Sequence, residues 1–307
     1  ARRGLARSYT PRMPRRIAFL TLEEVADFVI DDELAVAELR HRGWDAAEVP
    51  WSGPTDWSTY DIVLIRSTWD YASRSDEFLT TLRAIEASGA HLENPVRVVE
   101  WNIDKCYLRA LEARGVPVVP SVWGSGGTAE VFAHLFTTLQ DREIVIKPNI
   151  SGGARDTFRL HAPLSDVMLQ RLVDTFDGRD WFAQPFLRSV ITEGEYSLFY
   201  FDGRYSHAIQ KVPKPGDFRV QEEHGGDIVA VKATPELQRV AEQVLAAIAP
   251  VPFQARIDLI RLDDGQLALM EAELIEPSLY LRMDPGAPAR FADAIEASSV
   301  FGRVTPH

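Results

Sequence analysis

The sequence predicts an α/β fold, and two patterns of residues carry this prediction. Over residues 16–95, apolar runs typical of buried strands alternate with amphipathic segments typical of helices, which is the order of an open parallel sheet with right-handed crossovers. Near the C-terminus, two alternating β-prone runs flank Asp264-Gly265, which predicts a hairpin. A chain of 307 residues is long enough for a large core and two or three subdomains.

Composition and charge narrow the class of protein. The net charge is −12, although the first 16 residues carry six arginines and no acid, so the folded body is strongly acidic and a nucleic-acid partner is not expected. No apolar run reaches the 18 residues of a membrane span. The single cysteine, Cys106, excludes an internal disulfide and favours a reducing, cytoplasmic location. We expect residues 1–12 to be a disordered extension outside the fold.

The N-terminal domain is expected over residues 13–98. A helix over 31–42 is favoured by its apolar spacing and by Gly43, a stop signal, and a second helix over 75–88 ends at Gly89 in the same way. The run 60–65 is continuously apolar, as in a parallel strand buried on both faces. The other extended segments are 16–21, 45–51 and 91–95.

Ligands of open α/β sheets bind beyond the carboxyl ends of the strands. Directly after the run 60–65 come a cation, two hydroxyls, an acid and two aromatic rings, which suit a small zwitterion or carboxylate. The alternative is a capped loop whose aromatic side chains pack inward. The candidate substrate residues here are Arg66, Ser67, Thr68, Trp69 and Asp70, followed by Tyr71.

The central part of the chain places lysines beside flexible backbone. A helix is expected over 98–114, with Lys105 on it, and a strand over 143–149 that carries Lys147 near its end. The Ser-Gly-Gly loop that follows can lay backbone N–H groups around phosphate oxygens. The sequence contains neither a P-loop nor the G-x-G-x-x-G fingerprint of dinucleotide-binding proteins. Residues 181–187 predict an edge strand or hinge, because Pro185 cannot donate to a ladder.

A second hairpin is expected across Asp202-Gly203, between residues 195–201 and 205–212. It leads into a loop punctuated by Pro and Gly that carries Lys211, Lys214 and Arg219. A solvated loop is the default for such a stretch, but three cations in an acidic chain suit contact with a phosphate or carboxylate. An amphipathic helix over 234–248 then precedes the hairpin near the C-terminus.

That last hairpin gathers carboxylates. If Asp264-Gly265 forms its turn, eight side chains share one face, in the pairs Leu262 with Leu267, Ile260 with Leu269, Asp258 with Glu271 and Arg256 with Glu273. Like charges opposite one another destabilise a sheet, so the three acids need cations in addition to the arginine. A hard divalent cation, Mg²⁺ above all, fits them. A solvated acidic edge with Arg256 as an ion-pair partner is the alternative.

In this order, the features resemble the ATP-grasp ligases over residues 94–278. The preceding α/β unit resembles the domain before the grasp in glutathione synthetase and D-alanine–D-alanine ligase. The resemblance implies an α+β ATP-grasp fold in which an N-terminal open α/β domain precedes two subdomains with the nucleotide between them. It also implies Mg-ATP-dependent joining of a carboxylate to an amine through an acyl phosphate. The implied parts are a substrate domain (13–98), a linker helix (99–120), a lid subdomain (121–187) and a catalytic subdomain (188–307).

The same resemblance implies roles for the matching residues. Those that bind ATP are Lys105 and Lys147 on the phosphates, Ser151, Gly152 and Gly153 in the loop above them, Gln184, Phe186 and Leu187 at the adenine, Glu195 at the ribose, and Lys214. The catalytic residues are Arg256, for the oxyanion of the tetrahedral intermediate, with Lys211 and Arg219 at the γ-phosphate or acceptor. The Mg²⁺ ligands are Asp258, Glu271 and Glu273, the last where the family commonly has asparagine. Glu276 and Ser278 join the substrate residues.

A narrower resemblance concerns the segments RSTWDY and EPSLYLR, which are similar to those of the enzymes that close O-ureido-D-serine into D-cycloserine. It implies a small amino-acid-like substrate and an intramolecular reaction. The alternative is an intermolecular amino-acid or peptide ligase of the glutathione synthetase type. In another class, a non-catalytic nucleotide-binding protein stays open, while the missing glycine fingerprint disfavours a two-domain dehydrogenase. A homodimer is left open as the assembly.

Overall fold

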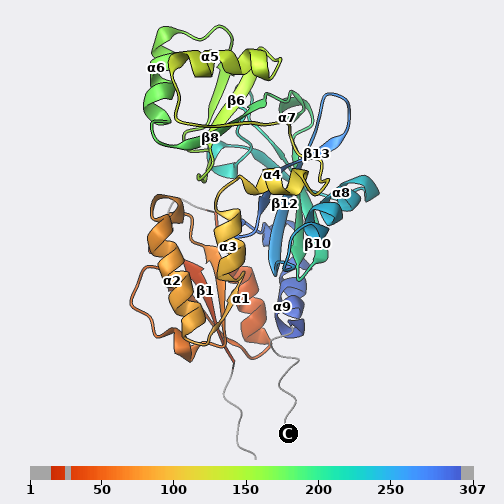
Figure 1. Ribbon diagram of the computed structural model, residues 1–307. Helices are drawn as coiled ribbons and strands as arrows, with labels where there is room; N and C mark the ends of the chain where they lie inside the picture. The colour runs from red at the N-terminus through yellow and green to blue at the C-terminus, as the bar shows by residue number, and fades with distance from the viewer. Residues whose placement is uncertain (1–14, 25–28, 299–307) are drawn as a thin grey trace, which may run out of the picture.

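The computed structural model describes residues 15–24 and 29–298, so the extension expected over residues 1–12 lies outside the described residues. Three sheets follow one another along the chain, and Figure 1 shows them from bottom to top as the N-terminal, C-terminal and middle sheets. Within the described ranges, no helix combines the length and the apolar character needed to cross a bilayer.

The N-terminal sheet is parallel, as expected, with the order β2-β1-β3-β4. Strand β3 is buried along its whole length because helices cover both faces of the sheet. The predicted helices and strands of this unit are confirmed to within two residues at most of their ends. They are β1 (Arg16–Thr21), α1 (Asp32–His41), β2 (Asp45–Pro50), β3 (Ile62–Ser67), α2 (Ser75–Ala87) and β4 (His91–Glu93).

The middle sheet is antiparallel, with the order β5-β8-β6-β7. Two helices pack on one of its faces, where aromatic and aliphatic side chains form a separate core. The prediction of an edge strand at residues 181–187 is wrong, because β8 lies between β5 and β6; Pro185 is its last residue, where a missing N–H does not interrupt the ladder. The elements are β5 (Val122–Ser125), α5 (Ala129–Thr138), β6 (Glu143–Pro148), β7 (Phe158–His161), α6 (Asp166–Thr175) and β8 (Asp180–Pro185).

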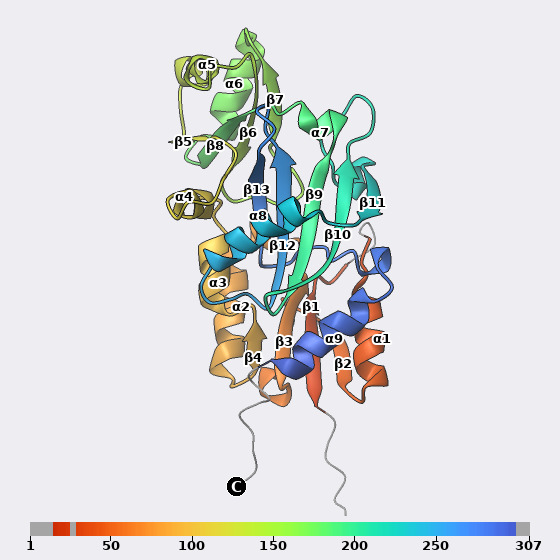
Figure 2. The same cartoon turned by 90° about the vertical axis from the view of Figure 1, so that its right-hand side faces the viewer.

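The C-terminal sheet is antiparallel, with the order β11-β10-β9-β12-β13. The outer face of this sheet packs on α8. Helix α9 contacts β9 and β10 and lies beside α1 of the N-terminal unit (Figure 2). Both predicted hairpins and the helix at 234–248 are confirmed. The elements are α7 (Ser189–Thr192), β9 (Glu195–Phe201), β10 (Arg204–Val212), β11 (Asp227–Val231), α8 (Pro235–Ala246), β12 (Gln254–Arg261), β13 (Leu267–Glu273) and α9 (Ala287–Ala297).

The register of the last hairpin differs from the prediction at its turn end. Asp258 pairs with Glu271 as expected, but the next pair is Leu259 with Leu269, because Met270 is an extra residue in β13. Such a bulge moves the following side chains to the other face. Leu267 and Leu269 therefore lie in the core on the outer face, and the prediction that all eight side chains share one face is wrong for these two.

The prediction of a single helix over residues 98–114 is also wrong. Two helices occupy this stretch, α3 (Val96–Asn102) and α4 (Tyr107–Glu112). Between them the Asp104 side chain accepts the N–H of Cys106 at 2.7 Å, a local bond that competes with the helical ladder. Lys105 consequently lies in a turn rather than on a helix, and its own N–H donates to the carbonyl of Asn149 at the end of β6.

Candidate active site

A row of alternating charges crosses the inner face of the C-terminal sheet. Glu195 on β9 pairs with Lys211 on β10 (2.5 Å), and Lys211 also lies 3.4 Å from Asp258 on β12. Arg256, two residues before Asp258 and on the same face, holds Asp258 at 3.0 Å and also binds Glu273 on β13. The row forms because strand residues two apart share a face and the register sets these positions side by side.

Two lysines from outside this sheet meet the β13 end of the row. Lys105 Nζ lies 3.1 Å from Glu271 Oε1 and donates to the carbonyl of Ser151 at 2.8 Å. Lys147, on the face of the middle sheet opposite its two helices, lies 4.9 Å from the centre of the Phe182 ring and 3.9 Å from the sulfur of Met270. The structure therefore brings the two predicted phosphate lysines to the predicted carboxylates.

Strand β13 is the edge strand that carries two of these acids, and side chains from α3 and α4 hold it in place. Asn102 accepts the N–H of Leu274 and donates to the carbonyl of Ala272, whose own N–H donates to the hydroxyl of Tyr107. These bonds satisfy backbone groups that an edge strand otherwise leaves open. Sequence reasoning missed both residues, because their partners lie about 165–172 residues away along the chain.

Burial and neighbouring charges shift the pKa values of the acids in different directions. Although burial favours the neutral acid, Arg256 and Lys211 hold the pKa of Asp258 at about 2. Burial raises the pKa of Glu273 to about 8, and the nearby carboxylates add to the effect of burial. Burial lowers the pKa of Lys147. The inner face thus concentrates charge where water is scarce, as sites that handle charged ligands do.

The acids fit a divalent cation by their chemistry, since carboxylate oxygens are the hard ligands that Mg²⁺ takes. Asp258 and Glu271 occupy directly opposite positions on β12 and β13. As placed, each acid is bound by a lysine or arginine, and within the described residues no three His, Cys, Asp or Glu side chains converge closely enough to hold an ion. An ion bound here would compete with Lys105 and Arg256 for these oxygens.

An apolar cluster lies beside the row, where the middle and C-terminal sheets meet. Phe186 and Leu187, which follow β8, pack with Ile260 of β12, and Met270 of the bulge lies against them. Gln184 is buried on β8, and its amide donates to the hydroxyl of Ser121 at 3.0 Å. Three of the residues predicted to contact adenine therefore converge on one region.

Two loops approach each other over the site. The loop with Ser151, Gly152 and Gly153 follows β6, and the Gly153 carbonyl lies 3.3 Å from Nε2 of His224 in the loop after β10. Of the three cations predicted in that second stretch, Lys211 belongs to the charged row, whereas Lys214 is exposed.

Arg219, the third of these cations, is paired with an acid of its own loop. Its guanidinium binds Asp217 at 2.8 Å, and its side chain is 37% exposed. Its role at the γ-phosphate or acceptor stays a prediction, and there it would have to share its charge with Asp217.

The last two residues of β3 point inward rather than into open space. Arg66 is 2% exposed and donates to Asp32 (3.0 Å), to Gln254 (2.8 Å) and to the carbonyl of Pro277 (3.0 Å). The sequence predicted direct contact of Arg66 with a substrate, but the side chain is almost fully buried and its guanidinium is bound by three groups of the protein. Its placement supports a positioning role instead. Ser67 binds the same Asp32 at 2.5 Å.

The other candidate substrate residues line the junction between the N-terminal and C-terminal sheets. Trp69 donates from its indole to the carbonyl of Glu276 at 3.0 Å, and Asp70 accepts from Trp51 at 2.8 Å. Thr68 is fully buried, and its hydroxyl has no hydrogen-bond partner among the described residues. Ser278 is half-buried.

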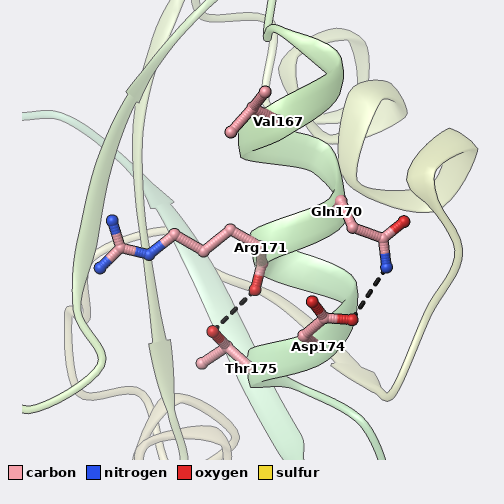
Figure 3. A pocket seen from close by; sticks show the side chains of 5 residues that line it. All are labelled: Val167, Gln170, Arg171, Asp174 and Thr175. Atoms are coloured by element: carbon pink, nitrogen blue, oxygen red, sulfur yellow. Dashed lines mark hydrogen bonds between the residues drawn. The ribbon is translucent and has the colours of Figure 1, made fainter.

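A shallow depression lies elsewhere, on the surface of α6. It is formed by exposed and half-buried side chains of α6 alone, and its Val167 is 81% exposed (Figure 3). Its lining contains no residue of the charged row or of the apolar cluster. The remaining lining residues are Gln170, Arg171, Asp174 and Thr175.

Two stretches of the chain match known protein families. Residues 17–94 match the family described as the N-terminal domain of D-cycloserine synthetase DcsG, and residues 129–260 match the ATP-grasp domain of prokaryotic glutathione synthetase. The chain is also 34% identical over 258 residues to the cycloserine biosynthesis protein DcsG of Streptomyces lavendulae, which covers 79% of this chain and 85% of that protein.

Solved structures agree with these matches. The crystal structure of D-cycloserine synthetase DcsG superposes with a TM-score of 0.79 at 30% identity, covering 91% of this chain and 98% of that one. The ATP-grasp ligase PsnB, complexed with its minimal precursor, Mg and ADP, superposes with a TM-score of 0.62 at 17% identity, covering 94% and 98% of the two chains. At that identity the likeness to PsnB concerns the fold alone. The ATP-grasp fold expected from the sequence is confirmed.

Proposed function

This chain belongs to the ATP-grasp ligases, ATP-dependent enzymes that form C–N bonds, and we propose that it closes O-ureido-D-serine into D-cycloserine. ATP and Mg²⁺ are used by this fold family in general. For this chain we propose that ATP lies between the middle and C-terminal sheets, with its phosphates at Lys105 and Lys147. A cytoplasmic location suits a reaction that consumes ATP.

The observation that carries the proposal is the junction of the charged row with Lys105 and Lys147. Cations from four parts of the chain meet the acids of β12 and β13 there. A triphosphate needs cations around it, and a divalent ion needs acids. A single ligand, ATP with a bound divalent ion, therefore accounts for both the cations and the acids of the site. The substrate assignment is supported by the match of residues 17–94 to the N-terminal domain of a D-cycloserine synthetase, because this part of the chain carries Arg66 and Trp69.

In the first step, the substrate carboxylate attacks the γ-phosphate and ADP leaves. The protein contributes position and charge rather than covalent chemistry. Lys105 and Lys147 hold the phosphates, and Phe186, Leu187 and Met270 cover the base. Asp258, Glu271 and Glu273 would hold a divalent ion, which would supply positive charge to neutralise the phosphate oxygens.

In the second step, nitrogen attacks the acyl carbon and phosphate leaves. Arg256 donates to the oxyanion of the tetrahedral intermediate, a contribution of about 3 kcal/mol for one such donor. The loops that meet at Gly153 and His224 exclude water, which would otherwise hydrolyse the acyl phosphate.

A phosphate-release screen tests this proposal. The full chain is incubated with Mg-ATP and with O-ureido-D-serine, free D-amino acids, or pairs of an amino acid and an amine donor. We expect phosphate and D-cycloserine in equal amounts with O-ureido-D-serine alone. Phosphate release that requires two separate organic substrates would replace ring closure with the intermolecular ligase, and no release with any substrate would favour the non-catalytic nucleotide-binding protein.

A further inference from the structure

Side chains of the N-terminal unit donate hydrogen bonds to the backbone of the segment after β13. Arg66 donates to the carbonyl of Pro277, and the indole of Trp69 donates to the carbonyl of Glu276, both at 3.0 Å. Two successive carbonyls are therefore held by one residue at the end of β3 and one residue just after it. This fixes the direction in which the side chain of Glu276 leaves the backbone.

That side chain points back toward the site. The carboxyl of Glu276 is hydrogen-bonded to Tyr71, which is 8% exposed and stacks on Phe78 with 4.8 Å between ring centroids. Charged groups near Glu276 include Lys105 from the α3–α4 turn, Arg256 from β12 and Glu273 from β13, and Glu271 of β13 acts on the same Tyr71. Glu276 thus lies near the two cations proposed to meet the phosphates and the oxyanion.

The environment also sets the proton affinity of this carboxyl. Burial raises the pKa of Glu276 to about 7, although the bond from Tyr71 and the charge of Lys105 act in the opposite direction. A carboxylate with a pKa near the working pH is well suited to take a proton. Glu273 is occupied by Arg256 and by its proposed role toward the metal ion, which leaves Glu276 as the acid available to the nucleophile.

We propose that Glu276, oriented by Tyr71, is the base that accepts the proton of the attacking nitrogen. This inference rests on the proposed ring closure and assigns its second step. The nitrogen lone pair forms the bond to the acyl carbon, the C–O bond to phosphate breaks, and phosphate leaves with that electron pair. The N–H proton moves to the Glu276 carboxylate and is later lost to solvent. The ring then still carries the carbamoyl group of the ureido nitrogen, and its reaction with water releases carbon dioxide and ammonia and leaves D-cycloserine.

The test separates the two chemical steps with hydroxylamine. This small nucleophile is unprotonated at neutral pH and traps the acyl phosphate as a hydroxamate without a protein base. With Mg-ATP and O-ureido-D-serine, Glu276→Gln should form D-cycloserine at least about 100-fold more slowly, the usual size of a general-base contribution. Hydroxamate formation in the presence of hydroxylamine should stay within about threefold of wild type, since position dominates that step.

Two further variants complete the comparison. Tyr71→Phe keeps the ring on Phe78 but removes the hydroxyl, so the acidic limb of its ring-closure rate should move to higher pH. Glu77→Gln, an exposed carboxylate on α2 that pairs with Arg74, is the matched control and should leave both products unchanged. In wild type the ring-closure rate should fall as the pH drops below about 7, and this limb should be absent from Glu276→Gln.

The outcomes distinguish the inference from its premise. Equal loss of D-cycloserine and hydroxamate in Glu276→Gln would overturn it and indicate a role in binding. Wild-type rates of ring closure in both variants would overturn it as well. If wild-type protein forms neither product, the proposed substrate is wrong, and the role of Glu276 falls with it.

Discussion

Asp258 and Glu271 lie directly opposite each other on β12 and β13, yet each carboxylate is bound by a cation from a different part of the chain. Arg256 holds Asp258 from the same strand, whereas Lys105 reaches Glu271 from the turn between α3 and α4. Opposed like charges destabilise a sheet, so this arrangement persists because cations surround it. The same cations and acids are those that a metal-bound triphosphate requires.

Replacing Glu271 with glutamine should abolish turnover without unfolding the protein. The amide keeps an oxygen for Lys105 and removes the repulsion from Asp258, so we expect the free energy of unfolding to change by about 1 kcal/mol or less. Loss of an acid beside the phosphates should lower kcat by about 100-fold or more. Urea unfolding and ADP release measure the two effects. The control is Glu236→Gln, which changes an exposed side chain of α8. Normal activity at ordinary Mg²⁺ would count against the metal role.

Lys147→Ala should raise the KM for ATP. A charge-assisted hydrogen bond to phosphate contributes about 1.5–3 kcal/mol, which corresponds to about 10–100-fold in affinity. The KM for the organic substrate should change much less, because Lys147 lies on the middle sheet, away from Arg66 and Trp69. The exposed Lys232 supplies the control variant, Lys232→Ala. An unchanged KM for ATP in Lys147→Ala would remove this lysine from the nucleotide site.

Arg66→Lys should affect the organic substrate more than ATP. A lysine keeps the charge beside Asp32, but its single ammonium cannot reproduce the fork that also reaches Gln254 and the carbonyl of Pro277. The segment after β13 would lose one of its two backbone anchors. We expect a clear rise in the KM for the amino-acid substrate and a small change for ATP in steady-state assays. Equal changes in both would place the substrate pocket elsewhere.

His207 should make stability depend on pH. Burial lowers its pKa to about 4 in the folded protein, against about 6.5 in the unfolded chain, so between these values the unfolded state binds more protons. Stability therefore falls as the pH drops through this window, by about 2 kcal/mol between pH 7 and pH 5. Urea titrations at both pH values should show this loss in wild type and a smaller one in His207→Gln. An equal loss in both proteins would assign the pH dependence to other groups.

The chemistry of the site was more predictable than its geometry. The alternation of Arg256 and Asp258, and of Glu271 and Glu273, is visible in the sequence because a strand sets side chains on one face every second residue. Lys105 and Lys147 were predicted by their place in the order of features. These residues do come together in the structure.

The structure differs from the sequence predictions where a hydrogen bond joins residues far apart in the chain, or where a side chain competes with the backbone for a hydrogen bond. Arg66 faces inward because Gln254, 188 residues later, accepts from it, and a single sequence does not contain that contact. The bulge at Met270 shifts the register of β13. The Asp-Gly turn signal predicts a hairpin but does not predict a bulge within its strand. Asp104, by contrast, was a readable signal, since a short acidic side chain inside a helical pattern often bonds to the backbone and ends the helix.

The most direct test of the account follows the oxygen of the substrate carboxylate. O-ureido-D-serine labelled with ¹⁸O in its carboxylate is converted by the full chain with unlabelled Mg-ATP, and the released phosphate is analysed by mass spectrometry. An acyl-phosphate ligase transfers one carboxylate oxygen to phosphate, so we expect one ¹⁸O per phosphate released. Unlabelled phosphate, with both labelled oxygens left on the organic molecule, would contradict the account.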